Sequence, residues 1–289
     1  MAVNRASGGS LSAGTWALVA MRAGLGLAAF ALFNLGAQNK VGALATDGRY
    51  ADLGDGLWPF VEVLNATSVS FEGALGVAPA AAAALLFGKL FLDAAGARLF
   101  ALRLAGDAPG GFWRVVFREG WSWWWASFRV ALIAAVLLAG GAAAVGAGYG
   151  WAVDRDGAPP TLLYRAIEAP AVAGGAALFW ALFVGAIATW MRADMAVRDS
   201  KGAVPAAPRA LGGLLRRPFA GLFLYVALNA APLAIGVALG AWLRLAEPFA
   251  AAAALTPAVA ALVIILQAFV WRATLLIAVR ARARQLGRI

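Results

Sequence analysis

The sequence predicts an all-α membrane protein, a polytopic bundle of six transmembrane helices. Hydrophobic residues make up 63% of the 289 residues and charged residues 13%, about half the ~25% usual for soluble domains, and the mean hydropathy is +0.80. Several apolar stretches reach the ~20 residues that a helix needs to cross a bilayer, whereas the short alternating segments of a membrane β-barrel are absent. Residues 1–289 are therefore expected to form a single transmembrane domain.

Six apolar stretches define the expected spans. Pro170, Pro218 and Pro257 lie at or just before the starts of three of them, where the missing amide hydrogen removes no helical hydrogen bond. The first stretch follows Arg5 as in a signal peptide, and we interpret it as an uncleaved signal-anchor helix. The expected spans are residues 15–36, 73–92, 121–148, 169–191, 219–243 and 256–279.

The placement of Lys and Arg predicts the orientation. Of the 24 basic residues, 15 lie in the segments that share a side with the termini, while nine of the 14 acidic residues lie in the segments on the other side. Cytoplasmic loops are enriched in Lys and Arg, so both termini are expected to be cytoplasmic. Heavy use of Ala and Arg is typical of GC-rich bacterial genomes, which favours a bacterial inner membrane.

The loops contain three expected surface elements. The outer loop, residues 37–72, includes "LWPFVEVLN", whose Trp58 and Phe60 are typical of a short interfacial helix. Residues 108–119 and 203–216 are amphipathic and are expected to lie as elbow helices on the inner leaflet.

The absence of Cys and His excludes most catalytic and cofactor chemistry. Disulfides, thiolate nucleophiles, His-ligated haem, the usual zinc sites and Ser-His-Asp catalysis all need one of them. No phosphate-binding Gly loop is present. No pair of carboxylates is placed for acid-base catalysis, because most carboxylates are expected on opposite sides of the bilayer. We therefore expect no enzyme, no cofactor and no metal site, and no nucleic-acid partner, because the basic charge follows the orientation rule.

Five charged residues are expected in one layer, in the inner third of the membrane: Arg22, Arg129 and Arg272 within spans, and Asp93 and Asp194 at span ends. A charge at that depth is costly unless it pairs or reaches water. One interpretation is a polar chamber open to the cytoplasm that binds an anion or a head group. The favoured alternative is structural, with snorkelling arginines and ion pairs to the two aspartates.

A second polar group is expected near the midplane. Asn229 and Pro232 in the fifth span and Gln267 in the sixth lie at similar depths. An interhelical hydrogen bond, worth ~0.6 kcal/mol on average, is the favoured interpretation. The alternative is a binding site formed by carbonyls that Pro232 leaves free.

Two rows of small residues predict close helix packing. Gly236 and Gly240 form a GxxxG pair, and Gly140, Ala144 and Gly148 form a second row. Such rows let helices approach closely. Packing within the bundle is favoured over dimerisation.

The segment "GWSWWWASFRV" is expected at the inner end of the third span. Tryptophans concentrate at head-group level, and Arg118 or Arg129 is expected to stack on their rings. A quinone or lipid tail against the rings is a further alternative. The expected interfacial aromatic belt comprises Trp113, Trp121, Trp123, Trp124, Trp125 and Phe128.

Residues 189–225 resemble a family of uncharacterised six-span bacterial membrane proteins. The family has an aromatic-Ala-Arg exit from its fourth span, which in this chain reads Trp-Met-Arg, followed by a Val-x-Asp turn and an amphipathic helix that ends in Arg-x-Pro. Residues 91–132 are similar to the same family's Gly-rich turn, aromatic elbow and arginine-bearing third span. The resemblance implies the six-span fold and no activity. The matching residues of the first stretch are Trp190, Arg192, Val197, Asp199, Arg216 and Pro218.

The expected function is that of a non-enzymatic accessory or scaffold subunit. It would contact membrane lipids and the helices of partner subunits in a larger complex. The alternative is a small transporter or lipid-handling protein with a polar site open to the cytoplasm. A homo-oligomer is a further alternative that the sequence favours less.

Overall fold

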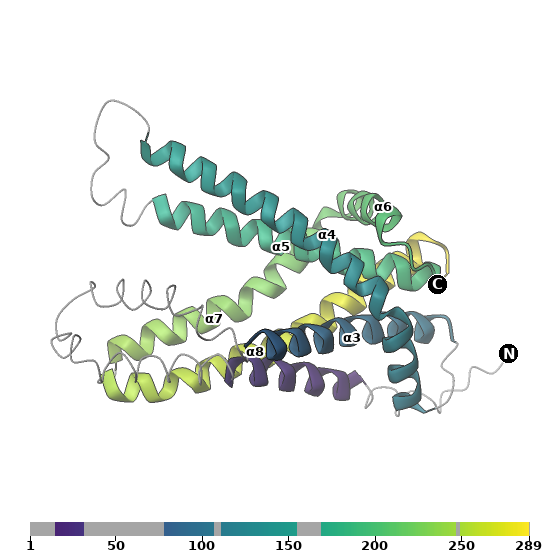
Figure 1. The fold of residues 1–289 in the computed structure, drawn as a ribbon, viewed down its shortest axis with the longest axis horizontal. Coiled ribbons are helices and arrows are strands. Elements are labelled where there is room, and N and C mark those ends of the chain that lie inside the picture. The colour runs from purple at the N-terminus through teal and green to yellow at the C-terminus, as the bar shows by residue number, and fades with distance from the viewer. Residues whose placement is uncertain (1–14, 32–77, 107–110, 155–168, 247–248, 289) are drawn as a thin grey trace. The chain divides into compact units, whose positions relative to one another are not determined.

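The computed structural model describes residues 15–31, 78–106, 111–154, 169–246 and 249–288 (Figure 1). The regular elements among them are all helices, which confirms the all-α class. The outer loop at 37–72 lies outside these residues, as do the first residues of the elbow expected at 108–119.

Seven helices and one π-helical turn are described. They are Thr15–Ala31, α3 (Ala78–Leu104), α4 (Phe112–Asp154), α5 (Ala169–Arg198), α6 (Ala203–Arg216), η3 (Phe219–Phe223), α7 (Leu224–Ala246) and α8 (Phe249–Gln285).

Four of these helices are long and apolar enough to cross a membrane. Their apolar parts are Phe112–Trp151, Val172–Arg198, Gly221–Leu239 and Pro257–Gln285, which correspond to the third to sixth expected spans. The structure thus fits a multi-pass membrane protein, and the count of six spans stays a prediction.

Three helices continue beyond the expected inner ends of their spans. α3 ends at Leu104, α5 at Arg198 and α8 at Gln285, against expected ends at 92, 191 and 279. The added segments contain no proline and are rich in Ala, Arg and Leu, which are good helix formers. Hydropathy therefore located the end of each apolar stretch but not the end of its helix.

The first expected elbow is not a separate helix. Its described part belongs to α4, which runs unbroken from Phe112 and changes direction near its start (Figure 1). Gly120 makes no turn; a Cβ there would lie 2.5 Å from Cζ of Phe91. The glycine thus permits close packing inside a helix, at the position where the sequence predicts the boundary between the elbow ending at 119 and the span beginning at 121.

The second expected elbow is a separate helix, α6, with the expected bounds. α5 ends before it in a Schellman motif, in which Ser200 N–H donates to Met195 O at 3.0 Å. Asp199 at the turn has φ 56°, a left-handed conformation that Asp tolerates better than most residues. This turn lets α6 pack back on α5.

Trp190 on α5 is the centre of this packing. It is 2% exposed and is the largest of the fully buried side chains. A Cβ would lie 3.0 Å from its ring at Gly213 and 3.2 Å at Gly221, so the two glycines allow α6 and η3 to approach α5. Four further α6 residues join the same core: Ala203, Ala206, Ala210 and Leu214.

The contacts group the chain into two compact units, whereas the sequence predicts a single transmembrane domain. One unit comprises Met1–Val19 and Leu90–Ile289, and the other is Ala20–Lys89. Within the larger unit α4 pairs with α5 and α7 with α8, and α5 also packs on α6 and α8 (Figure 1). α5 is therefore the central helix of the larger unit.

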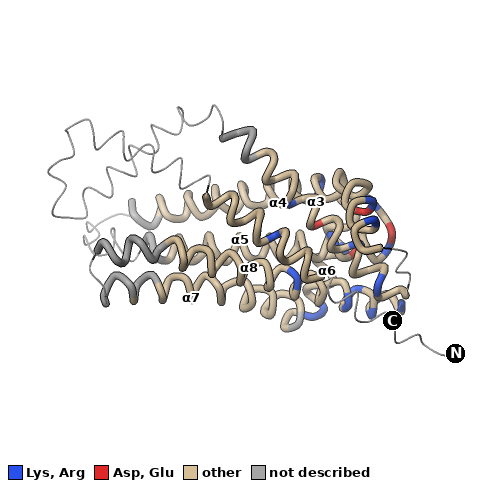
Figure 2. The backbone as a smooth tube through the Cα atoms, turned by 90° about the horizontal axis from the view of Figure 1, so that it is seen from below, with Lys and Arg blue, Asp and Glu red and all other residues tan. Residues whose placement is uncertain are grey.

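Charged residues gather at one end of the helices of the larger unit (Figure 2). The extensions of α5 and α8, the start of α4 and the whole of α6 meet there. This end contains the candidate site.

Candidate functional site

The buried carboxylate of Asp194, on α5, is surrounded by three arginines. Its side chain is 0% exposed, and Arg282 Nε lies 2.6 Å from its Oδ1. Arg198 Nε lies 2.9 Å from the same oxygen, and Arg209 Nε lies 3.0 Å from Oδ2. The Arg209 contact lacks hydrogen-bond geometry, so it is a coulombic pair. Because these arginines come from α5, α8 and α6, one carboxylate holds three helices together.

Arg98 on α3 forms a second junction. Its Nε lies 3.2 Å from Glu119 Oε2 on α4, its Nη2 lies 3.0 Å from Asp199 Oδ1, and its Nη1 donates to Ala196 O at 2.8 Å. The side chains of Arg98 and Glu119 are 11% and 9% exposed, so water screens this pair only weakly, whereas Asp199 is 68% exposed. Arg98 thereby ties α3 to α4 and to the end of α5.

Of the two aspartates of the expected layer, Asp194 lies near the end of α5, whereas Asp93 lies within α3, 11 residues before its end at Leu104. Asp93 pairs with Arg192 at 3.3 Å, and Asp194 pairs with the three arginines named above, none of which belongs to the expected layer. Arg22 lies in the smaller unit. The expected pairing of Asp194 with Arg129 or Arg272 is therefore corrected, because the helical extensions and α6 supply nearer arginines.

The other layer arginines have neutral partners. Arg129 Nη2 donates to the backbone oxygen of Lys201 at 3.1 Å. Arg272 Nη2 donates to Thr15 Oγ1 at 3.1 Å, and its guanidinium carbon lies 4.3 Å from the ring centroid of Trp16. Both arginines thus contact protein groups.

The expected midplane residues meet in one interhelical hydrogen bond. Gln267 Nε2 donates to the backbone oxygen of Asn229 at 3.0 Å, while the Asn229 side chain donates to Tyr225 O at 2.9 Å. The two amides face backbone oxygens instead of each other. Pro232 lies inside α7, three residues after the carbonyl that Gln267 binds.

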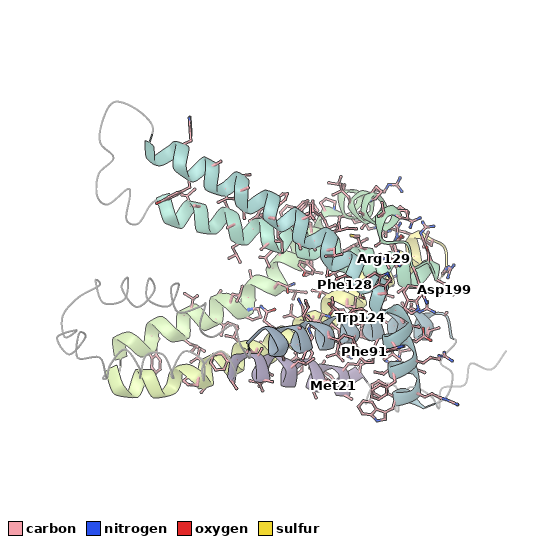
Figure 3. All side chains as sticks on the ribbon, viewed as in Figure 1. Met21, Phe91, Trp124, Phe128, Arg129 and Asp199 are labelled. Carbon is pink, nitrogen blue, oxygen red and sulfur yellow. The ribbon has the colours of Figure 1, made fainter. Side chains whose placement is uncertain are left out.

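The aromatic belt divides into exposed and buried members. Trp113, Trp121 and Trp125 are exposed by 51%, 72% and 57%, and Trp124 and Phe128 stack with ring centroids 5.5 Å apart (Figure 3).

Trp123, by contrast, is 6% exposed and belongs to the core. Arg98 lies 4.6 Å and Lys201 5.6 Å from its ring centroid. Its place in the belt is corrected, because the helical twist turns it toward Arg98 on α3 and Lys201 beyond the end of α5, while Trp121 and Trp125 face outward.

The two rows of small residues behave differently. A Cβ at Gly236 would lie 2.6 Å from Val263 Cγ2, so this glycine allows α7 to pack closely on α8. The surroundings of Gly240 are not among the features that the structure describes. The second row faces outward: Gly140, Ala144 and Gly148 are exposed, and nothing lies within 4 Å of a Cβ at either glycine. The expected packing of this row inside the bundle is therefore wrong.

Gly141, one residue along from that row, makes the close contact between α4 and α5. The ring of Trp180 occupies the place of a Cβ at Gly141, and its Nε1 donates to Leu137 O at 2.8 Å. The glycine that allows α4 and α5 to pack closely is thus one position away from the row that the spacing predicted.

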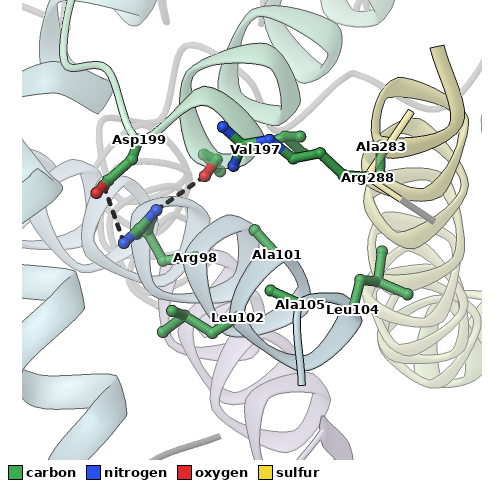
Figure 4. A pocket seen from close by; sticks show the side chains of 10 residues that line it. Arg98, Ala101, Leu102, Leu104, Ala105, Val197, Asp199, Ala283 and Arg288 are labelled. Carbon is green, nitrogen blue, oxygen red and sulfur yellow. Dashed lines mark hydrogen bonds and ion pairs between the residues drawn. The ribbon is translucent and has the colours of Figure 1, made fainter. Parts of the chain in front are cut away.

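A pocket of about 120 Å³ opens at the charged end, between α3, α5 and α8 (Figure 4). Its polar side chains are Arg98, Asp199 and Arg288, and its other lining residues are apolar. Arg98 is engaged by Asp199 and by the Ala196 carbonyl, so Arg288 is the cation at this pocket for which no ion pair is found among the described residues.

The residues that hold this end together were not among the site residues predicted from the sequence: Arg98, Glu119, Arg192, Arg209 and Arg282. One signal was available, the spacing of four residues between Asp194 and Arg198, which is typical of a helical ion pair and indicates that α5 continues. The pairs between different helices have no such signal.

Comparison of the chain with protein-family models, curated proteins and solved structures gives no match. The resemblance to six-span bacterial membrane proteins therefore stays a prediction, and function must be argued from the site.

Proposed function

We propose that the protein is a non-enzymatic accessory or scaffold subunit of a membrane complex, located in a bacterial inner membrane with both termini in the cytoplasm. Its charged end holds the helices in a fixed arrangement, and its apolar faces contact lipid and partner helices.

The observation that carries this proposal is how the charged groups are used. Asp194 is shared by three arginines, Asp93 pairs with Arg192, and Arg98 binds two carboxylates and a carbonyl. Groups paired in this way hold helix ends in register and are not free to bind a substrate. This supports a structural role for the charged end.

The apolar faces support contacts with lipid and with other helices. In α4, only 6% of the stretch with high hydropathy is buried inside the protein, and the share in α7 is also 6%. The first turns of α4 expose Trp113, Phe117 and Trp121, while α6 exposes Val204 and Leu215. Aromatic and apolar side chains beside arginines suit the head-group level of a bilayer, which supports an inner-leaflet position for both segments.

Native purification tests this function. The full chain, extracted in mild detergent without crosslinking, should bring down a stoichiometric partner. Recovery of only the monomer with lipid contradicts the scaffold function.

A matched pair of variants tests where the partner binds. Gly140→Leu/Gly148→Leu fills the outward row of α4 without an internal clash, so it should lose the partner and keep the fold. Gly174→Leu is the control, because nothing lies within 4 Å of a Cβ there either, and it should retain the partner. Equal recovery in both variants would show that the partner does not use this row.

The pocket supports transport or lipid handling as a second candidate. It places Arg288 beside an apolar lining at the end proposed to face the cytoplasm. Anion flux into vesicles that contain the purified chain, abolished by Arg288→Gln and retained by Arg284→Gln, would favour this candidate over the scaffold.

A further inference from the structure

Five arginines in the described part of the chain have buried side-chain nitrogens without a hydrogen bond, and two of them lie on α3 and α8. Arg103, in the last turn of α3, has Nε and Nη2 buried without a hydrogen bond, and Arg272, on α8, has Nε in the same state. Neither arginine forms an ion pair with a carboxylate in the described part of the chain. A buried charged donor without an acceptor is unfavourable, so these groups lack a counter-charge.

The two charges lie near enough to affect each other. α3 packs directly on α8, where a Cβ at Gly96 would lie 3.1 Å from the Trp271 ring. Burial, and then the charge of Arg272, lower the pKa of Arg103. Two neighbouring cations with open donors favour an anion between them.

Protein contacts fix one of the two guanidinium groups. Arg272 donates through Nη2 to Thr15 Oγ1, and Thr15 is fully buried. The ring of Trp16 lies against the same guanidinium, 4.3 Å from its carbon. These neutral contacts orient the group and leave both its charge and its Nε available, which lowers the entropy lost on binding a ligand.

We propose that Arg103 and Arg272 together bind a phosphate-type oxyanion. Three donor nitrogens without acceptors on two planar guanidiniums suit a ligand with several acceptor oxygens, and arginine is favoured for phosphate recognition. In a membrane protein such an anion comes from a phospholipid head group or from free phosphate. The proposal goes beyond the partner-binding function and does not depend on it.

Thermal unfolding of the full chain in phosphate-free detergent micelles tests the site. Phosphatidylglycerol and inorganic phosphate are added separately, and diacylglycerol, which has the same tails without phosphate, is the control ligand. We expect phosphatidylglycerol alone to raise the unfolding temperature if the source is a head group, and inorganic phosphate to raise it as well if the site accepts the free anion. No shift with either, or an equal shift with diacylglycerol, would overturn the proposal.

Variants assign the effect to these arginines. Arg103→Gln should weaken the affinity for the ligand about tenfold or more, so that the same shift in unfolding temperature needs at least that much more ligand. This is the size expected when a charge-assisted hydrogen bond is removed. Arg103→Lys keeps the charge without the planar fork and should bind more weakly than the wild type. Arg284→Gln, an exposed change on α8, should respond as the wild type does.

The ligand-free proteins provide a second readout. Without ligand, Arg103→Gln should unfold at the same temperature as the wild type or higher, because it removes a charge that Arg272 repels. A lower unfolding temperature, combined with an unchanged ligand response, would show that Arg103 is only structural and would refute the site. Partner recovery is measured separately, so the two proposals fail independently.

Discussion

Replacing Asp194 by Asn removes the charge at which α5, α6 and α8 meet and nearly preserves the volume of the side chain. Arg282, 9% exposed and 2.6 Å away, would then keep a buried charge without its partner, which costs about 3–5 kcal/mol. Arg198 and Arg209 are 34% exposed, and water screens them, so each adds about 1 kcal/mol at most. Most of the expected loss therefore comes from the Arg282 pair.

Titration with denaturing detergent in mixed micelles, followed by tryptophan fluorescence, measures this loss. Asp199→Asn is the control, because its carboxylate is 68% exposed and its loss should cost less than about 1 kcal/mol. If Asp194→Asn shifts the midpoint no more than Asp199→Asn, the buried junction does not hold the helices together. The double change Asp194→Leu/Arg282→Met should recover much of the stability, since apolar pairs replace buried ion pairs well.

Three further changes test the packing, the midplane contact and the topology. Gly141→Leu should destabilise the α4–α5 pair by about 1–3 kcal/mol through overpacking, whereas Gly140→Leu should change the unfolding midpoint little; equal effects would contradict the assignment. Gln267→Leu should cost only about 0.6 kcal/mol by the same titration, and a loss several times larger would indicate that the midplane group does more than pair helices. Single cysteines replacing Asp52 or Ser200 in this cysteine-free chain should be labelled in intact cells by an impermeant reagent only at position 52. Labelling at position 200 would contradict the predicted orientation.

Hydropathy predicted the positions of the long helices well but their ends poorly. The transfer of apolar side chains into lipid depends on composition, which is local and readable along the chain. Helix continuation depends on backbone propensity, and nothing in the sequence stops α5 before the turn at Asp199. Hydropathy therefore predicts a loop beyond position 191, although these residues include Asp194 and two of its three arginine partners.

The amphipathic pattern located α6 with both its ends, because its apolar and charged positions alternate with helical spacing. The same reasoning placed a boundary at Gly120, where the structure has a continuous helix. A glycine is compatible with a turn or with close packing, and only the ring of Phe91 against it distinguishes the two.

The sequence by itself determined the class of this protein. Its composition requires an apolar surrounding, its apolar stretches require helices, and the absence of Cys and His removes whole classes of chemistry; each of these conclusions depends on residue types or on neighbours along the chain. The tertiary structure decided which charges meet. Asp194 and Arg282 are 88 residues apart, and their contact depends on the packing of α8 against α5. The same packing turns Trp123 inward while Trp121 and Trp125 face out, because the direction of a side chain relative to the core is a property of the assembled helices.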